Sequence, residues 1–190
     1  MIACGPEESQ PEVGDFLETE VYEGVESFGV EYYFSDSARV SAQMFATRVI
    51  EREEPVVEDQ EVEKVVSPVK DEDKEVKTEM VHFLSRGVRL YFLNFRGIAH
   101  STIKSDSGVF RREKGIAQLI GQVEMTNHEN ETMKTEELFW DKEKDSVYTD
   151  KFVRIETPDK IITGSRGLRA NTDFTSYTIF GIRGEIETEE

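Results

Sequence analysis

Val88-Arg89-Leu90-Tyr91-Phe92-Leu93, followed directly by Asn94-Phe95-Arg96-Gly97, is the stretch that decides the fold of this chain. Its first part alternates, and because successive side chains of a strand point to opposite sides, Val88, Leu90 and Phe92 share one face. Its second part has the composition of a turn. After the turn, a second alternating run puts another set on one face, namely Ala99, Ser101, Ile103 and Ser105. The whole segment therefore predicts a β-hairpin.

The same unit occurs before and after this hairpin. Residues 30–34 alternate, 36–39 resemble a turn, and a further strand then places Val40, Ala42, Met44 and Ala46 on one face. A third copy runs from Gly121 through a turn at 127–130 to Met133 and Thr135. The phase then slips by one residue, because Leu138 and Trp140 share a face that Thr135 does not. A bulge near 136–137 is the expected cause.

Short alternating runs continue to the C-terminal region. Val147, Thr149, Val153 and Ile155 precede a Thr157-Pro158-Asp159 turn, glycines follow at 164 and 167, and a last strand is expected within 176–186. No segment has the pattern of a helix of three turns. Hairpin after hairpin at short spacing predicts an all-β, antiparallel architecture, and the internal repetition favours a stacked pair of sheets.

One segment departs from this pattern. Residues 51–79 carry many acidic side chains, two prolines and no aromatic residue, so we expect a disordered acidic insertion there. Its valine pairs at 56–57 and 65–66 leave a marginal extra hairpin as the alternative. The predicted organisation is a flexible tether over 1–15 and a single β domain over 16–190 that contains the insertion.

Composition excludes several functions. The 190 residues include 23 basic and 40 acidic side chains, a net charge of -17, which repels phosphate backbones and excludes nucleic-acid binding. No stretch approaches the roughly 20 apolar residues that cross a bilayer. The three histidines, at 82, 100 and 128, lack metal-ligand spacing, and the single cysteine forms no disulfide within the chain. We expect no metal, no cofactor and no catalytic residue.

That cysteine lies near the N-terminus. Cys4 follows Met1-Ile2-Ala3 and precedes a short polar run with two prolines. This arrangement resembles the end of a bacterial lipobox, in which the cysteine is acylated and a flexible tether follows. The alternative is an ordinary free thiol. The lipobox interpretation predicts a lipoprotein anchored to a membrane through Cys4.

Several blocks of the chain carry a resemblance to a known family. They are residues 87–94, 101–108, 133–141, 147–155, Ile162-Thr163-Gly164 and 167–171, in that order, with 30–46 fitting a first hairpin. These blocks resemble LptC, the periplasmic lipopolysaccharide-export family. The Thr-x-x-Leu-x-Trp pattern of Thr135, Leu138 and Trp140, taken with its downstream strand, is moderately specific for this family. The acidic insertion departs from the family pattern, as does a lipoprotein cysteine in place of a transmembrane helix.

The resemblance implies a V-shaped antiparallel β-jellyroll of the OstA, LptA and LptC type, whose interior groove holds the acyl chains of lipopolysaccharide. It also implies partners: the LptB–LptF–LptG ABC transporter, which supplies the lipid, and a periplasmic LptA-like bridge, which receives it. The expected location is the periplasmic face of the inner membrane. No chemistry is implied, because the energy comes from the transporter.

The alternating apolar residues are the candidates for the lipid-facing wall. We predict that lipid contacts Leu90, Phe92, Val123, Met125, Leu138, Trp140, Val153 and Ile155. An apolar inner face must either collapse on itself or stay open for a ligand, so each residue is also explained as ordinary sandwich core. Trp140 in particular is equally explained as a core anchor.

Two other features have simpler explanations. The carboxylates at 136–137, Asp141 and Glu143 invite comparison with glycoside hydrolases, but a solvated strand face and turn explain them better. Residues 177–186 have the pattern of an exposed edge strand, which is either a dock for the LptA-like protein or a closing strand of the domain. An envelope module that pairs through its sheet edges and holds no lipid is therefore the second hypothesis.

Overall fold

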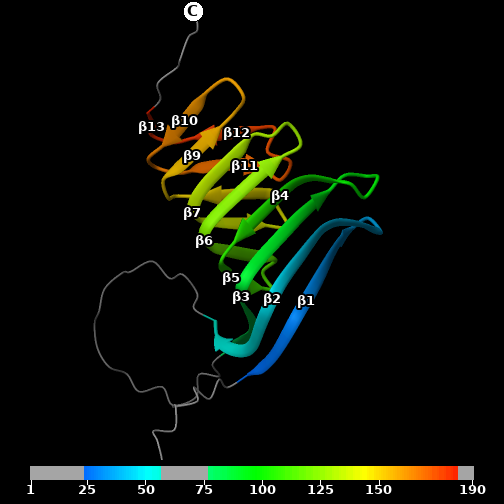
Figure 1. Ribbon diagram of the computed structural model, residues 1–190. Coiled ribbons are helices and arrows are strands. Elements are labelled where there is room, and N and C mark those ends of the chain that lie inside the picture. Colours follow the sequence, from blue (N-terminus) through cyan, green and yellow to red (C-terminus); the bar gives the residue numbers. More distant parts are fainter. Residues whose placement is uncertain (1–23, 57–76, 184–190) are drawn as a thin grey trace, which may run out of the picture.

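The computed structural model describes residues 24–56 and 77–183, and its regular elements there are all β-strands (Figure 1). They are β1 (Val25–Asp36), β2 (Arg39–Pro55), β3 (Thr78–Leu93), β4 (Ala99–Ser105), β5 (Ser107–Arg111), β6 (Ile116–Asn127), β7 (Thr132–Asp141), β8 (Ser146–Thr149), β9 (Val153–Glu156), β10 (Ile161–Gly164), β11 (Leu168–Asn171), β12 (Tyr177–Ile179) and β13 (Ile182–Arg183). Every pairing between them is antiparallel. The predicted all-β, jellyroll-type fold is confirmed.

Long strands run through two layers of this sheet. One half of β3 pairs with β4 and the other half with β5, and β6 contacts the same two strands in the same way. Likewise β7 pairs with β9 through 132–134 and with β8 through 139–141. The sheet therefore folds back on itself. The first layer holds β4, β9, β10 and β13, and the second holds β5, β8, β11 and β12.

The fold line lies where these long strands bend. On β3 the bend is at Arg86–Gly87, and on β6 at Gly121–Gln122, and all four residues have positive φ. Asp106, between β4 and β5, joins the two bends: its carbonyl accepts from Gly87 N (2.9 Å) and its N–H donates to Gly121 O (3.0 Å). The predicted slip near 136–137 is confirmed. Its extra residue belongs to β6, where 121 and 122 together face Glu136.

The first hairpin agrees closely with its prediction. Ser37 and Ala38 both have positive φ, as a two-residue hairpin turn requires. Phe34 is buried, and Val30 and Tyr32 pack against the core on the same face. Val40 is exposed, because the register of β1 against β2 shifts next to the turn.

The predicted insertion is too long at both ends. Residues 51–55 belong to β2 and pair with 78–82 of β3, from Glu51 opposite His82 to Pro55 opposite Thr78. Contacts of Arg52 help to hold residues 51–55 in the sheet. Its guanidinium lies 4.2 Å from the centroid of the Phe83 ring and 2.7 Å from a carboxylate oxygen of Glu54. Cross-strand packing thus holds acidic residues in strands. The remainder of the predicted insertion, 57–76, lies outside the described residues, as do the tether and Cys4.

The core lies between the two layers. Buried apolar side chains from both layers form a single continuous cluster, to which β2, β3, β6 and β7 each contribute several residues and β1 contributes Phe34. Alternation produces this arrangement, because each strand points every second side chain inward. The interior between the layers is therefore mainly apolar, with a few buried polar side chains such as Ser101 and Thr149 among them.

Candidate functional site

All eight residues predicted to face lipid lie on the inner surfaces of the layers. Leu90, Phe92, Val123, Met125, Val153 and Ile155 come from the first layer, and Leu138 and Trp140 from the second. Each is between 0% and 2% exposed. The alternation thus assigned their facing correctly. In this structure their side chains pack against the opposite layer, and their contact with lipid stays a prediction.

An aromatic cluster joins the layers at the β1 side of the interior. Phe34 of β1 meets Trp140 of β7 with ring centroids 4.9 Å apart and Phe110 of β5 at 5.4 Å, both nearly perpendicular. Phe92 of β3 meets Trp140 in the same way at 5.5 Å. Such edge-to-face pairs stabilise beyond their buried area. These rings close the interior toward the β1 edge.

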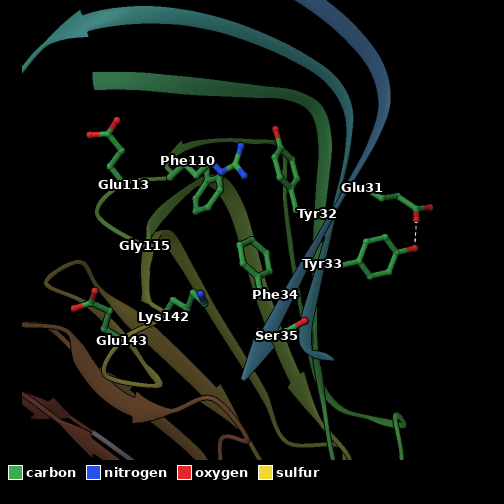
Figure 2. Close-up of a pocket in the computed structure, with 11 residues that line it drawn as sticks. Glu31, Tyr32, Tyr33, Phe34, Ser35, Phe110, Glu113, Gly115, Lys142 and Glu143 are labelled. Carbon is green, nitrogen blue, oxygen red and sulfur yellow. Dashed lines mark hydrogen bonds between the residues drawn. The ribbon is translucent and has the colours of Figure 1, made fainter. Parts of the chain in front are cut away.

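A pocket of about 500 Å³ opens on the outer side of this cluster. Figure 2 shows the rings of Tyr32, Phe34 and Phe110 pointing into it, while Glu31 and Tyr33 extend away on the other side of β1. The turns after β5 and β7 supply a charged rim of Arg112, Glu113, Lys142 and Glu143. The pocket thus has aromatic rings on its inner side and a mostly polar lining elsewhere, and it lies at the lateral opening between β1 and the second layer.

A buried histidine links the layers beside the pocket. His82 Nδ1 shares a hydrogen bond of 2.9 Å with Tyr32 Oη and lies 3.5 Å from a carboxylate oxygen of Glu51. Burial, with the nearby Glu51 carboxylate, raises the pKa of Tyr32 to about 12. Burial also lowers the pKa of His82 below its usual value, and Arg112 adds to this, while Glu51 opposes it. The histidine is therefore neutral at physiological pH.

Two of the carboxylates compared above with glycoside hydrolases, Asp141 and Glu137, make local contacts with neighbouring side chains. Asp141 is almost fully buried and accepts hydrogen bonds from Lys144 N (3.0 Å) and Lys144 Nζ (2.7 Å). Burial alone would raise the pKa of Asp141, but these hydrogen bonds outweigh it and lower the pKa. Glu137 instead accepts from Gln118 at 2.6 Å. Both groups stabilise strand and turn geometry.

The sequence patterns did not predict that Phe110 packs against Tyr32 and Phe34 at the pocket. The facing of Tyr32 and Phe34 is visible in their alternation, but Phe110 belongs to β5, a five-residue strand that no expected hairpin contained. Only the folded sheet brings Phe110 against β1. Among the described residues, no group of three or more His, Cys, Asp and Glu side chains is arranged to hold a metal ion.

The comparison with protein families bears on what this interior does. A family model described as "Lipopolysaccharide-assembly, LptC-related" matches residues 75–185, which is more than half of the chain. The chain belongs to the LptC-related family. Membership gives the protein a role in lipopolysaccharide transport. No curated protein gives a significant match to the chain.

The LptC-related match begins just before β3 and covers every later strand. The first hairpin, β1 and β2, precedes it. The pocket therefore combines aromatic residues of that hairpin with turns from the matched region. Residues 24–56 and 77–183 contain no helix long and apolar enough to cross a membrane.

The C-terminal edge of this LptC-related chain is divided between the layers. β12 pairs only with β11 in the second layer, and β13 only with β10 in the first, as far as the described residues extend. Residues 177–183 thus do lie at sheet edges, as the sequence predicts. Whether a partner strand docks there stays a prediction, and residues 184–186 lie outside the described residues.

Proposed function

We propose that this protein is a non-enzymatic lipopolysaccharide-binding component of the Lpt export system. It takes lipopolysaccharide from the LptB–LptF–LptG ABC transporter and passes it to an LptA-like periplasmic bridge for outer-membrane biogenesis. The observation that carries the proposal is the continuous apolar interior between two layers, next to a recess at the β1 edge, in a chain of the LptC-related family.

The energetics of such an interior favour acyl chains. Each methylene transferred from water into apolar surroundings contributes about 0.8 kcal/mol, so several chains offset the cost of separating packed side chains. The phosphorylated head group is different, because a chain of net charge -17 attracts it weakly. The head group therefore stays in solvent outside the rim.

The proposal includes a location and a mode of contact. Acylated Cys4 would tether the domain at the periplasmic face of the inner membrane, with residues 1–15 as the spacer. Within the described residues β1, β12 and β13 each have a strand neighbour on one side only, so their other sides would offer backbone groups to strands of partner proteins. Transfer along a row of edge-paired domains then needs no catalytic residue.

A second candidate function is favoured by the packing itself. All eight predicted wall residues are almost completely buried, as in a sheet pair that holds no ligand. In that case the protein is an envelope lipoprotein that pairs with other proteins through its sheet edges only. It would take up neither lipopolysaccharide nor an apolar fluorescent probe.

Reconstitution separates these functions. Vesicles that hold the LptB–LptF–LptG transporter and lipopolysaccharide are mixed with this protein and a soluble LptA-like protein carrying a photocrosslinker. We expect ATP-dependent lipopolysaccharide adducts on the acceptor that require this protein, and an earlier adduct on this protein itself. Adducts on the acceptor that form equally well without it would overturn the proposal.

A further inference from the structure

Trp140 carries a buried hydrogen-bond donor that the fold leaves unused. Its side chain is 2% exposed, and its Nε1 has no hydrogen-bond partner among the described residues. Indole nitrogen only donates, so nothing but an acceptor atom can satisfy it. Buried tryptophan usually finds such a partner, and a buried polar group without one destabilises the fold. This donor therefore needs an explanation.

The nearest polar group along the strand is already engaged. Asp141 follows Trp140 directly, but its two carboxylate oxygens accept hydrogen bonds from the backbone and side chain of Lys144. Across the strands, Trp140 is paired with Ala117 and Val147, which have apolar side chains. The ring itself contacts Phe34 and Phe92. The surroundings supply apolar surface to Trp140 and no acceptor.

A second unpartnered atom lies in the same cluster. His100 Nδ1 is also buried without a hydrogen bond, and the His100 ring stacks on Phe92 with centroids 6.5 Å apart. Phe92 thus contacts both rings that bear an unpartnered nitrogen. No other buried side-chain nitrogen or oxygen of the described residues lacks a partner. Both exceptions therefore belong to one place in the interior.

Trp140 is also close to the pocket. Phe34 lines the pocket and contacts Trp140, so a single aromatic ring separates the indole from the lateral opening. A ligand that enters past Phe34 reaches Trp140 first and the deeper apolar residues afterwards. The acceptor for Nε1 must be uncharged, since a carboxylate or phosphate in this apolar cluster would be strongly disfavoured.

We propose that Trp140 is a polar anchor that donates a hydrogen bond from Nε1 to the carbonyl oxygen of an acyl ester or amide. The acyl chain beyond that carbonyl packs against Phe92 and the inner wall, and the head group lies toward the pocket. The inference rests on the proposed lipid-binding function and adds the point at which the lipid is held in register. Trp140 is a binding residue here and performs no chemistry.

The test uses the fact that Trp140 is the only tryptophan of the chain, so its indole N–H gives one cross-peak in a ¹⁵N–¹H spectrum. Two single-chain lysophosphatidylcholines of equal chain length serve as probes, one ester-linked and one with an ether in place of the ester. We expect the ester lipid to move the indole proton downfield. The ether lipid should perturb the methionine methyls of the interior and leave the indole proton almost unmoved.

Variants provide the second measurement. Trp140→Phe keeps an aromatic ring and should weaken binding of the ester lipid by roughly 3- to 10-fold, the range for one hydrogen bond, without weakening the ether lipid. Phe92→Leu is the matched control: it alters the same cluster, keeps the donor, and should weaken both lipids equally.

The outcomes distinguish failure of the proposed Trp140 hydrogen bond from failure of the proposed lipid-binding function. If both lipids bind wild-type protein equally and the indole proton does not move, the anchor is wrong and lipid binding stands. If Trp140→Phe weakens both lipids alike, the ring acts through packing and the anchor is again wrong. If neither lipid binds folded wild-type protein, the anchor and the lipid-binding function both fail.

Discussion

The two ends of this sheet differ in how closely the layers approach. At the β1 end, bulky rings hold the layers apart, with Phe34 meeting Trp140 at a centroid distance of 4.9 Å, and a pocket opens beside them. At the C-terminal end the layers touch through a glycine. A Cβ on Gly164 of β10 would lie 2.3 Å from Ile179 Cγ2 of β12. The β1 end, where a pocket lies outside the packed rings, is called the open end, and the C-terminal end, where the layers touch, is called the closed end.

The lengths of the strands reinforce this difference. β1 is 12 residues long and passes through both layers, whereas β12 and β13 end the two layers separately with 3 and 2 residues. The described sheet therefore ends in one long edge strand at the β1 side and in two short edge strands at the other side.

The largest expected effect is at the open end. Phe34→Ala should lower the free energy of unfolding by about 3 kcal/mol, because it removes a buried ring and leaves a cavity. It should also increase the uptake of an apolar fluorescent probe, since the ring separates pocket and interior. Denaturant unfolding and probe titration measure both.

Phe28→Ala is the matched control for this change. Phe28 lies on the same strand but is 63% exposed, so its loss should change stability by less than about 0.5 kcal/mol and leave probe uptake unaltered. Equal effects of the two substitutions would show that Phe34 does not close the interior.

The next effect is at the closed end. Gly164→Ala should destabilise by about 2 kcal/mol, because the new methyl group overlaps Ile179 and forces the layers apart. Gly97→Ala is the control: a Cβ there meets nothing within 4 Å, and only its φ of 74° causes strain, about 1 kcal/mol. A thermal unfolding series in which Gly164→Ala is as stable as Gly97→Ala would contradict the close approach of the layers.

The two ends show which features of the fold could be predicted from the sequence and which could not. Alternation predicted the inward facing of Phe34 and of the eight wall residues, since facing depends only on position along a strand. It predicted neither Phe110 against Phe34 nor Ile179 against Gly164, because those contacts depend on how the sheet folds back. It also assigned 51–55 and 78–79 to an insertion, since their acidic composition hides a cross-strand pairing. Strand periodicity is local, whereas the pocket is a product of topology.

A third effect depends on pH and involves the open end only. The pKa of His82 is lowered in the folded protein, so the unfolded chain binds the proton more readily as pH falls through the usual histidine range. Stability contributed by neutral His82 is therefore complete above about pH 6.5 and is lost below it. Tyr32, Glu51 and Arg112 are the polar and charged groups that face this ring.

His82→Gln tests that dependence. The unfolding midpoint of the wild type should fall more steeply than that of the variant between about pH 7.5 and about pH 5.5. His100, whose pKa burial also lowers, stays in both proteins and so cancels from the difference. If the unfolding midpoints of the two proteins changed with pH in parallel, protonation of His82 would not contribute to the stability of the open end.

The smallest effect is at the rim. Lys142 is one of two basic side chains at the pocket, where Glu31, Glu113 and Glu143 lie as well, so the rim has no excess of positive charge. Lys142→Gln should therefore change the affinity for an anionic single-chain lipid by less than about twofold at physiological ionic strength. A tenfold loss, measured by the quenching of Trp140 fluorescence, would show that the rim binds the head group directly.

The central claim, that lipopolysaccharide lies between the layers, is tested most directly by photocrosslinking in cells. A photoreactive residue is placed at Phe92, on the inner face of β3, and in a control at Arg89, an exposed residue on the outer face of the same strand. We expect a lipopolysaccharide adduct at Phe92 and none at Arg89. Adducts at neither position, from folded protein at its normal location in the envelope, would contradict it and favour the module that pairs through its sheet edges.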